Sequence, residues 1–226
     1  NRIWSEKIIF SKSQNKASEK KEMLMLKEFI DKIISLKKKK NITIIDLHNT
    51  SSPNGVFSIV NNIKEKKIAE YLKTPIIHNL FNKVKGSFAQ YYSNQNISTI
   101  VFEGGSIGDP ASINNHEVSI WKMLEKRDFI ESRFIPKRVQ KNNTNMNNFS
   151  QNKQGYYFVK YIYKINDKNE FLMNPNMQNF EKITKNQIIA SNRNGPIKSP
   201  YDGFLLMPLY QKEGKEGFYI IQKKGN

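Results

Sequence analysis

Few residues in this sequence could carry chemistry, because it holds three histidines, no cysteine and no Gly-x-Ser-x-Gly segment. Cysteine nucleophiles, thiolate metal sites, disulfides and the serine elbow of the α/β-hydrolases are therefore not available. Two of the remaining residues stand at suggestive positions. His48 ends the apolar run 41–48, and Glu103 ends the run 98–103, directly before two glycines. A histidine can bind a metal ion, and a carboxylate can accept a proton from water.

Both residues lie at the carboxyl ends of predicted strands. The runs 41–48 and 98–103 are short, rich in β-branched residues and nearly continuously apolar, which predicts buried strands. Open α/β sheets bind ligands at this edge, because the loops that follow the strands converge there. From the residues alone, His48 is either a metal ligand or a structural histidine, since one histidine cannot complete a zinc site. Glu103 is either a general base or an exposed carboxylate at a strand end.

Helices are predicted between these strands. Residues 18–36 place apolar side chains at three- and four-residue spacings with Lys and Glu between them, and residues 60–71 form a second helical stretch. Residues 111–126 predict a third helix, with Asp109-Pro110 at its entry. Helices that alternate with parallel-type strands predict an α/β layer fold.

The composition of the chain changes after residue 128. A polar, Asn-rich stretch (141–154) leads to the strand-like segment 156–163, and short apolar runs split by Gly and Pro follow, with turn residues at 202–203. This pattern is typical of β-rich structure. We therefore predict a catalytic domain over residues 1–128 and a β-rich domain over residues 129–226.

Composition narrows the class of protein. The 226 residues include 38% hydrophobic residues, enough for a packed interior, and no segment approaches the roughly 18 apolar residues of a membrane span. The lack of cysteine favours the cytoplasm. A net charge of +17 would attract polyanions, but much of it lies in lysine runs such as 37–40 and 64–67, which we interpret as solvated surface. Membrane association is not expected, and nucleic-acid binding is the less favoured reading.

Four segments together resemble the succinylglutamate desuccinylase/aspartoacylase family. They are the opening Asn1-Arg2, the stretch Asp-Leu-His-Asn-Thr (46–50), the stretch Val-Phe-Glu-Gly-Gly (101–105), and Ser-Pro-Tyr-Asp-Gly-Phe-Leu-Leu-Met-Pro-Leu-Tyr (199–210). They occur in the family's order and span the chain from residue 1 to about 222. The resemblance implies a zinc-carboxypeptidase-like α/β/α sheet domain, incomplete at its N-terminus, followed by a small β-rich barrel or sandwich domain.

The resemblance also implies a role for individual residues. His48 matches the family's third zinc ligand, and Glu103 matches the general base that takes a proton from the metal-activated water. Asn1 and Arg2 match a pair that holds the substrate carboxylate, which suits a planar guanidinium. Tyr210 stands where family members carry a substrate-contacting tyrosine. The implied cofactor is Zn²⁺, and the implied substrate is a small anionic N-acyl amino acid.

The family's first two zinc ligands have no counterpart in this sequence, and the resemblance places them before Asn1. Because the first residue is Asn and not Met, we expect the chain to begin inside a longer protein. This fragment alone is then expected to bind zinc poorly and to be inactive. His78 and His116 match no family ligand, and we interpret each as a surface or structural histidine.

The leading hypothesis is therefore zinc-dependent hydrolysis of the amide bond of an N-acyl amino acid. A zinc carboxypeptidase acting on peptides would use the same residue types, but the β-rich region favours the amidohydrolase. A catalytically inactive homologue is a third possibility. A basic nucleic-acid-binding module is a fourth, with the tyrosines of 156–163 as stacking platforms. Chelators would inactivate a zinc enzyme, whereas salt would weaken phosphate binding. The sequence leaves the acyl group, the amino acid and the oligomeric state open.

Overall fold

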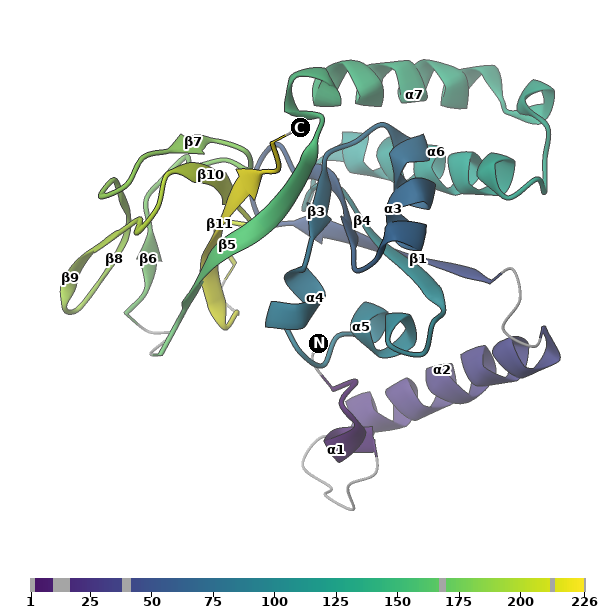
Figure 1. The fold of residues 1–226 in the computed structure, drawn as a ribbon, viewed down its shortest axis with the longest axis horizontal. Helices are drawn as coiled ribbons and strands as arrows, with labels where there is room; N and C mark the ends of the chain where they lie inside the picture. The colour runs from purple at the N-terminus through teal and green to yellow at the C-terminus, as the bar shows by residue number, and fades with distance from the viewer. Residues whose placement is uncertain (1–2, 10–16, 38–41, 167–169, 212–213, 226) are drawn as a thin grey trace.

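The structure is a computed structural model that describes residues 3–9, 17–37, 42–166, 170–211 and 214–225 (Figure 1). Within these ranges the chain forms helices packed on a large mixed sheet, with a β-rich part at one end. No helix in the described part of the chain combines the length and the apolar character needed to cross a membrane.

The fold is built around one mixed sheet, for which the described residues supply eight strands in the order β1, β4, β2, β3, β5, β11, β10 and β7. Parallel pairing joins β1 to β4, β2 to β3 and β3 to β5, and the other neighbours are antiparallel. A separate three-stranded sheet has the order β6, β8, β9. The strands are β1 (Thr43–Thr50), β2 (Val56–Val60), β3 (Ile76–His78), β4 (Ser98–Ser106), β5 (Tyr156–Lys164), β6 (Leu172–Met173), β7 (Lys182–Ile183), β8 (Ile188–Asn192), β9 (Gly195–Lys198), β10 (Gly203–Leu206) and β11 (Glu216–Lys223).

Helices cover both faces of the sheet. The described helices are α1 (Glu6–Ile9), α2 (Ala17–Leu36), α3 (Ile63–Ala69), α4 (Leu80–Lys83), α5 (Phe88–Ser93), α6 (Pro110–Lys126) and α7 (Lys137–Ser150), with short 3₁₀ turns at Glu70–Leu72, Ser132–Phe134 and Gln151–Lys153. The α3, α6 and α7 helices lie on one side of the central strands, and α4, α5 and α2 lie on the other (Figure 1). The α/β layer fold predicted from the sequence is therefore confirmed.

Side chains of β4 show how the two faces alternate. Ile100 and Phe102 pack in the cluster that also contains Val118 of α6 and Met146 of α7. Val101 packs in a cluster on the opposite face. Successive side chains of a strand point to opposite faces, so Glu103 shares the face of Val101 and lies away from α6.

The predicted helices and strands are largely confirmed. The helix predicted over 18–36 is α2, the helix over 111–126 is α6, and the strand over 98–103 is β4, which continues to Ser106. The stretch 60–71 is helical only from Ile63. Asn62 caps α3 there, because its side chain accepts hydrogen bonds from the backbone N–H groups of residues 64 and 65.

Three features differ from the sequence prediction. The run 41–48 corresponds to β1, which lies at the edge of the described sheet and is half-exposed rather than buried, because only β4 pairs with it. The Asn-rich stretch 141–154 belongs mostly to a helix, α7, and not to β-rich structure. Strand β2 was not predicted, and it runs antiparallel to β4.

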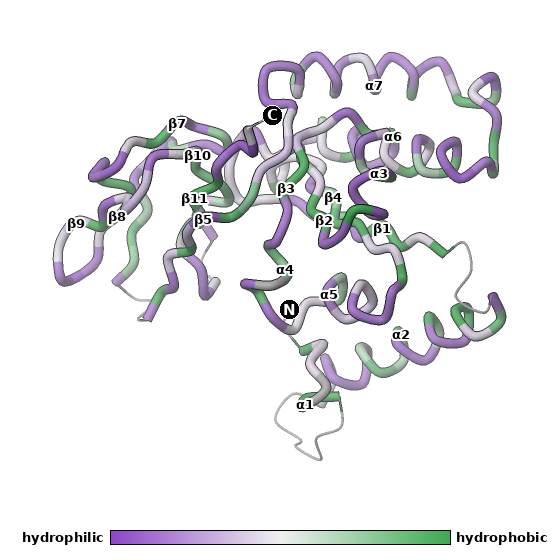
Figure 2. Tube along the Cα trace, in the orientation of Figure 1, coloured by the Kyte–Doolittle hydropathy of each residue, from purple (hydrophilic) through white to green (hydrophobic). Residues whose placement is uncertain are grey.

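Helix α7 forms because of its packing and not because of its composition. Figure 2 shows that it is predominantly hydrophilic, in contrast to the hydrophobic central strands. Val139 and Met146 are seven residues apart, lie on one helix face and are both buried in the cluster with α6. Tertiary burial of a narrow apolar stripe can outweigh a weak intrinsic helix preference.

The sheet crosses the predicted domain boundary. Strand β5 pairs in parallel with β3, and α7 packs on α6 through the shared cluster, so elements on both sides of residue 128 belong to one core. The two-domain division at residue 128 stays a prediction.

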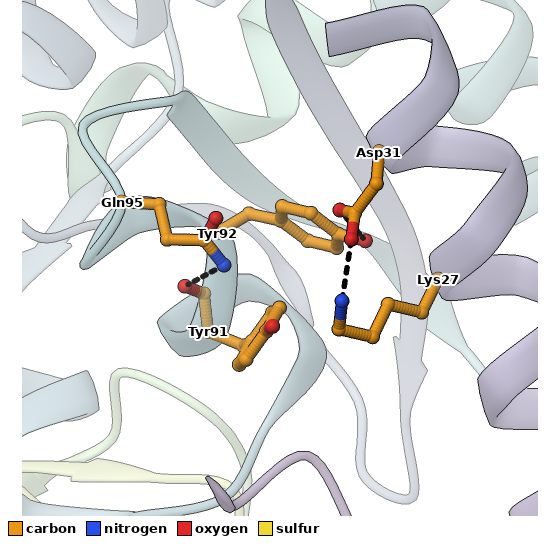
Figure 3. A network of polar contacts seen from close by, with 5 residues as sticks. All are labelled: Lys27, Asp31, Tyr91, Tyr92 and Gln95. Carbon is orange, nitrogen blue, oxygen red and sulfur yellow. Dashed lines mark hydrogen bonds and ion pairs between the residues drawn. The ribbon is translucent and has the colours of Figure 1, made fainter. Parts of the chain in front are cut away.

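Helix α2 is fastened to α5 by a polar contact (Figure 3). Lys27 and Asp31 form an ion pair one turn apart on α2. The buried Tyr92 donates a hydrogen bond from its hydroxyl to Oδ1 of Asp31, at 3.3 Å. Burial, followed by the nearby Asp31 carboxylate, raises the pKa of Tyr92 above its ordinary value. The phenol therefore remains a hydrogen-bond donor throughout the neutral pH range.

Candidate active site

His48 and Glu103 lie side by side on neighbouring strands. In the parallel pair of β1 and β4, His48 stands in register with Glu103, so the two side chains point to the same face. The His48 side chain is about half-exposed, at 52%, whereas Glu103 is only 3% exposed. Phe57 of β2 lies opposite Glu103 on its other side and is completely buried. The arrangement places a buried carboxylate beside an accessible imidazole.

Asp46 orients the imidazole of His48. Asp46 and His48 share one face of β1, and Oδ1 of Asp46 lies 3.1 Å from Nε2 of His48. The hydrogen bond with Asp46 raises the pKa of His48, against the opposing effect of burial. A carboxylate on one ring nitrogen fixes the ring and leaves the other nitrogen, Nδ1, available to a ligand. This is the environment in which metal-binding histidines are usually found.

Glu103 has the properties of a base that works near neutral pH. Burial raises the pKa of Glu103 to about 7, with the charge on His48 lowering it and the charge on Asp46 raising it. Its Oε2 is buried and has no hydrogen-bond partner among the described residues. A carboxylate whose pKa lies close to the working pH can both accept and return a proton.

His116 of α6 packs on the ends of β1 and β4, on the face opposite to His48 and Glu103. Its Nε2 donates a hydrogen bond to Oδ1 of Asn49, at 2.8 Å, because an amide oxygen can only accept. The ring packs so closely on Gly104 that a Cβ there would lie 2.5 Å from it. Burial, and then the charge on His48, lowers the pKa of His116. His78 is held by the backbone oxygen of Asn61, 2.9 Å from its Nε2.

Tyr210 is engaged within the β-rich part of the chain. Its hydroxyl donates to the backbone oxygen of Asn174, at 2.5 Å, and accepts from the backbone N–H of Met177, at 2.8 Å. Its ring is partly exposed. A contact between Tyr210 and substrate stays a prediction. Asn1 and Arg2 lie outside the described residues.

The described residues offer part of a metal site. His48, with Asp46 behind it, fits one histidine ligand and its orienting carboxylate. No group of three or more His, Cys, Asp or Glu side chains within the described ranges could hold a metal ion. Structural and catalytic zinc sites use at least three protein ligands, so further ligands would have to come from elsewhere.

Asp46 joins the candidate site, although the sequence prediction gave it no role of its own. Its position two residues before His48 was the available signal, because residues i and i+2 of a strand share a face. The hydrogen bond between Asn49 and His116 had no such signal, since it joins a strand end to a helix 67 residues further along the chain.

No protein-family model matches the sequence, and no curated protein matches it. The structure, in contrast, superposes on the crystal structure of a succinylglutamate desuccinylase from Vibrio parahaemolyticus with a TM-score of 0.65. The match covers 99% of this chain and 64% of that one, at 14% sequence identity. This chain has the succinylglutamate desuccinylase fold.

Two further structures support the assignment of the succinylglutamate desuccinylase fold. A succinylglutamate desuccinylase/aspartoacylase from Rhodobacter sphaeroides matches with a TM-score of 0.57 and 12% identity, over 81% of this chain and 59% of that one. An ectoine utilization protein from Ruegeria pomeroyi matches with a TM-score of 0.54 and 10% identity, over 84% and 64%. The chain spans less than two thirds of the length of each of these structures. The resemblance inferred from short motifs is thus confirmed for the fold.

Proposed function

We propose that this protein is a zinc-dependent amidohydrolase that cleaves the amide bond of an N-acyl amino acid. The observation that carries the proposal is the buried Glu103, which lies in register with the accessible His48 at the carboxyl ends of two parallel strands. The desuccinylase fold supports the same reaction class. A buried carboxylate whose Oε2 has no partner among the described residues is costly to keep, and such groups concentrate at functional sites.

In this proposal His48 is one zinc ligand, Asp46 orients it, and the other ligands come from outside the described residues. When bound, zinc would polarise the amide carbonyl and make water more acidic. Glu103 accepts a proton from the water that attacks the carbonyl carbon. It then delivers that proton to the leaving nitrogen as the C–N bond breaks, which yields a carboxylate and a free amine.

The proposed substrate is a small anionic N-acyl amino acid. The matched structures include enzymes named for succinylglutamate. Asn1 and Arg2 are the proposed clamp on a substrate carboxylate, and Tyr210 is the proposed contact from the β-rich part.

A substrate panel tests the reaction class. The protein, expressed from the start codon of its reading frame, should release free amino acid from N-succinyl, N-acetyl and other N-acyl amino acids, and a chelator should abolish the release. A preference for cleaving C-terminal residues from peptides would favour a carboxypeptidase instead. Chelator-insensitive binding of nucleic acid, without hydrolysis of either substrate class, would contradict the proposal.

Asp46→Asn is expected to weaken zinc binding by about 10- to 100-fold, because it removes the charged acceptor that orients His48. Competition with a chromophoric chelator measures the affinity. Asp128→Asn is the matched control, because residue 128 is a loop position with positive φ that asparagine tolerates. Equal zinc affinities of the Asp46→Asn variant and the unmodified protein would remove Asp46 from the site.

A further inference from the structure

The loop after His48 is attached to the β-rich part by one buried amide. Asn179 is 1% exposed, and its Nδ2 lies 2.7 Å from Oγ of Ser52 and 2.8 Å from the backbone oxygen of Pro53. The same nitrogen lies 3.3 Å from Oγ1 of Thr50. The Oδ1 of Asn179 accepts a hydrogen bond from the backbone N–H of Met207, at 2.7 Å. One side chain, from the segment before β7, therefore joins the loop to Met207, which directly follows β10.

Neighbouring polar contacts reinforce this attachment. Oγ of Ser51 donates to the backbone oxygen of Pro208 and accepts from the backbone N–H of Tyr210, both at 3.2 Å. Nδ2 of Asn54 donates to Oε1 of Gln178, at 2.6 Å. All of these contacts join the loop at 50–54 to residues beyond 177.

Thr50 lies between this attachment and the candidate site. It follows His48 by two residues in β1, is buried, and pairs with Ser106 across a register shift that separates it from His48. Its Oγ1 donates to the backbone oxygen of Ser52, at 2.7 Å. Gly55 packs against it so tightly that a Cβ there would lie 2.3 Å from Oγ1. Thr50 is therefore in contact with Ser106, Ser52, Gly55 and Asn179.

We propose that Asn179 is a positioning residue for His48. By holding Thr50, Ser52 and Pro53, it fixes the end of β1 and with it the direction of the imidazole. Strand β1 needs such support, because among the described residues β4 alone pairs with it. The β-rich part thus contributes to the metal-binding geometry without contributing a ligand. The metal-binding aspect rests on the proposed function, whereas the loop-fixing aspect does not.

The test compares Asn179→Ala with Asn192→Ala in the protein expressed from its own start codon. Asn192 is also in the β-rich part, but its Nδ2 donates to the hydroxyl of Tyr163, away from the loop. Two quantities are measured: zinc affinity by chelator competition, and amide hydrogen exchange along the chain. Asn179→Ala is expected to weaken zinc binding by about tenfold or more and to accelerate exchange selectively at residues 50–54 and at Met207, whose backbone N–H loses its acceptor. Asn192→Ala is expected to change neither.

Ser52→Ala provides a milder variant if Asn179→Ala does not fold, because it deletes only the 2.7 Å contact with Oγ. Ser52→Ala is expected to weaken zinc binding and to accelerate exchange in the loop, but by less than Asn179→Ala does. Uniformly faster exchange, or zinc affinity equal to that of Asn192→Ala, would reduce Asn179 to a general structural residue and overturn the proposal. If the unmodified protein binds no zinc, the proposed function fails, and the exchange pattern alone decides whether Asn179 fixes the loop.

Discussion

Glu103→Gln is expected to lower kcat by about a thousandfold and to leave KM nearly unchanged. Glutamine keeps the size of the side chain but cannot accept a proton from water, and general-base catalysis typically contributes 10²- to 10⁴-fold. Steady-state kinetics with the N-acyl amino acid that the unmodified protein hydrolyses best measures the change. Glu131→Gln, on an exposed turn, is the control and should retain full activity. A Glu103→Gln variant with kcat within tenfold of the original would exclude Glu103 as the base.

The same substitution is expected to stabilise the metal-free protein at alkaline pH. Burial raises the pKa of Glu103 to about 7 from its ordinary 4.5, so the folded state binds more protons than the unfolded state between these values. Stability therefore falls as the pH rises from about 4.5 to about 7. Because glutamine carries no charge, Glu103→Gln should be more stable at pH 8 by roughly 3 kcal/mol, and this difference should disappear below pH 4.5.

Urea unfolding of the chelator-treated proteins at pH 4 and pH 8 measures this difference. A variant that is less stable than the original at pH 8 would show that the carboxylate is well solvated or paired. Gain of stability together with loss of activity would indicate that the buried charge is kept for function.

Glu65→Ala is expected to destabilise the fold by about 3 kcal/mol or more, which corresponds to a fall in Tm of roughly 10 °C for a chain of this size. Glu65 is completely buried. Its Oε2 accepts from the backbone N–H groups of Asn61 and Asn62, at 2.6 and 3.3 Å. Its Oε1 accepts from Oγ of Ser93 and the backbone N–H of Thr99, at 2.8 and 3.1 Å. Alanine would leave these donors without the carboxylate that ties α3 to α5 and β4.

Thermal and urea unfolding measure the effect, with Glu70→Ala as the control. Glu70 lies one turn further along, is exposed, and pairs with Lys66 on the surface at 3.6 Å, so its loss should change stability by less than about 1 kcal/mol. If the two alanine variants unfold alike, the Glu65 hydrogen bonds contribute little net stability.

Local sequence patterns predicted the helices and strands that form because of the residues within their own segments. Helices α2 and α6 have three- and four-residue apolar spacing, and β4 has a continuous apolar run between turn residues. The apolar spacing and the flanking turn residues were therefore sufficient to predict these elements. Helix α7 was missed because its asparagines disfavour a helix, and it is stabilised by burial of Val139 and Met146 against α6. The half-exposed edge position of β1 depends on which strands pair with it, which its own residues do not encode.

Some features of the candidate site could likewise be predicted from the sequence, and others could not. The sequence placed His48 and Glu103 at strand carboxyl ends, the edge where α/β sheets bind ligands, and the parallel pairing of β1 and β4 brings them into register. The contact between Asp46 and His48 could have been predicted from the two-residue period. The role of Asn179 could not, because its partner Thr50 lies 129 residues away, and such contacts follow from the packing of the β-rich part on the loop.

The zinc content of the purified protein tests the central claim most directly. The unmodified protein and its His48→Ala variant would be compared by elemental analysis after removal of loosely bound metal. We expect about one zinc per molecule of the unmodified protein and little zinc in the His48→Ala variant. A protein that holds no zinc, or a His48→Ala variant that holds as much as the original, would contradict the assignment of His48 as a metal ligand.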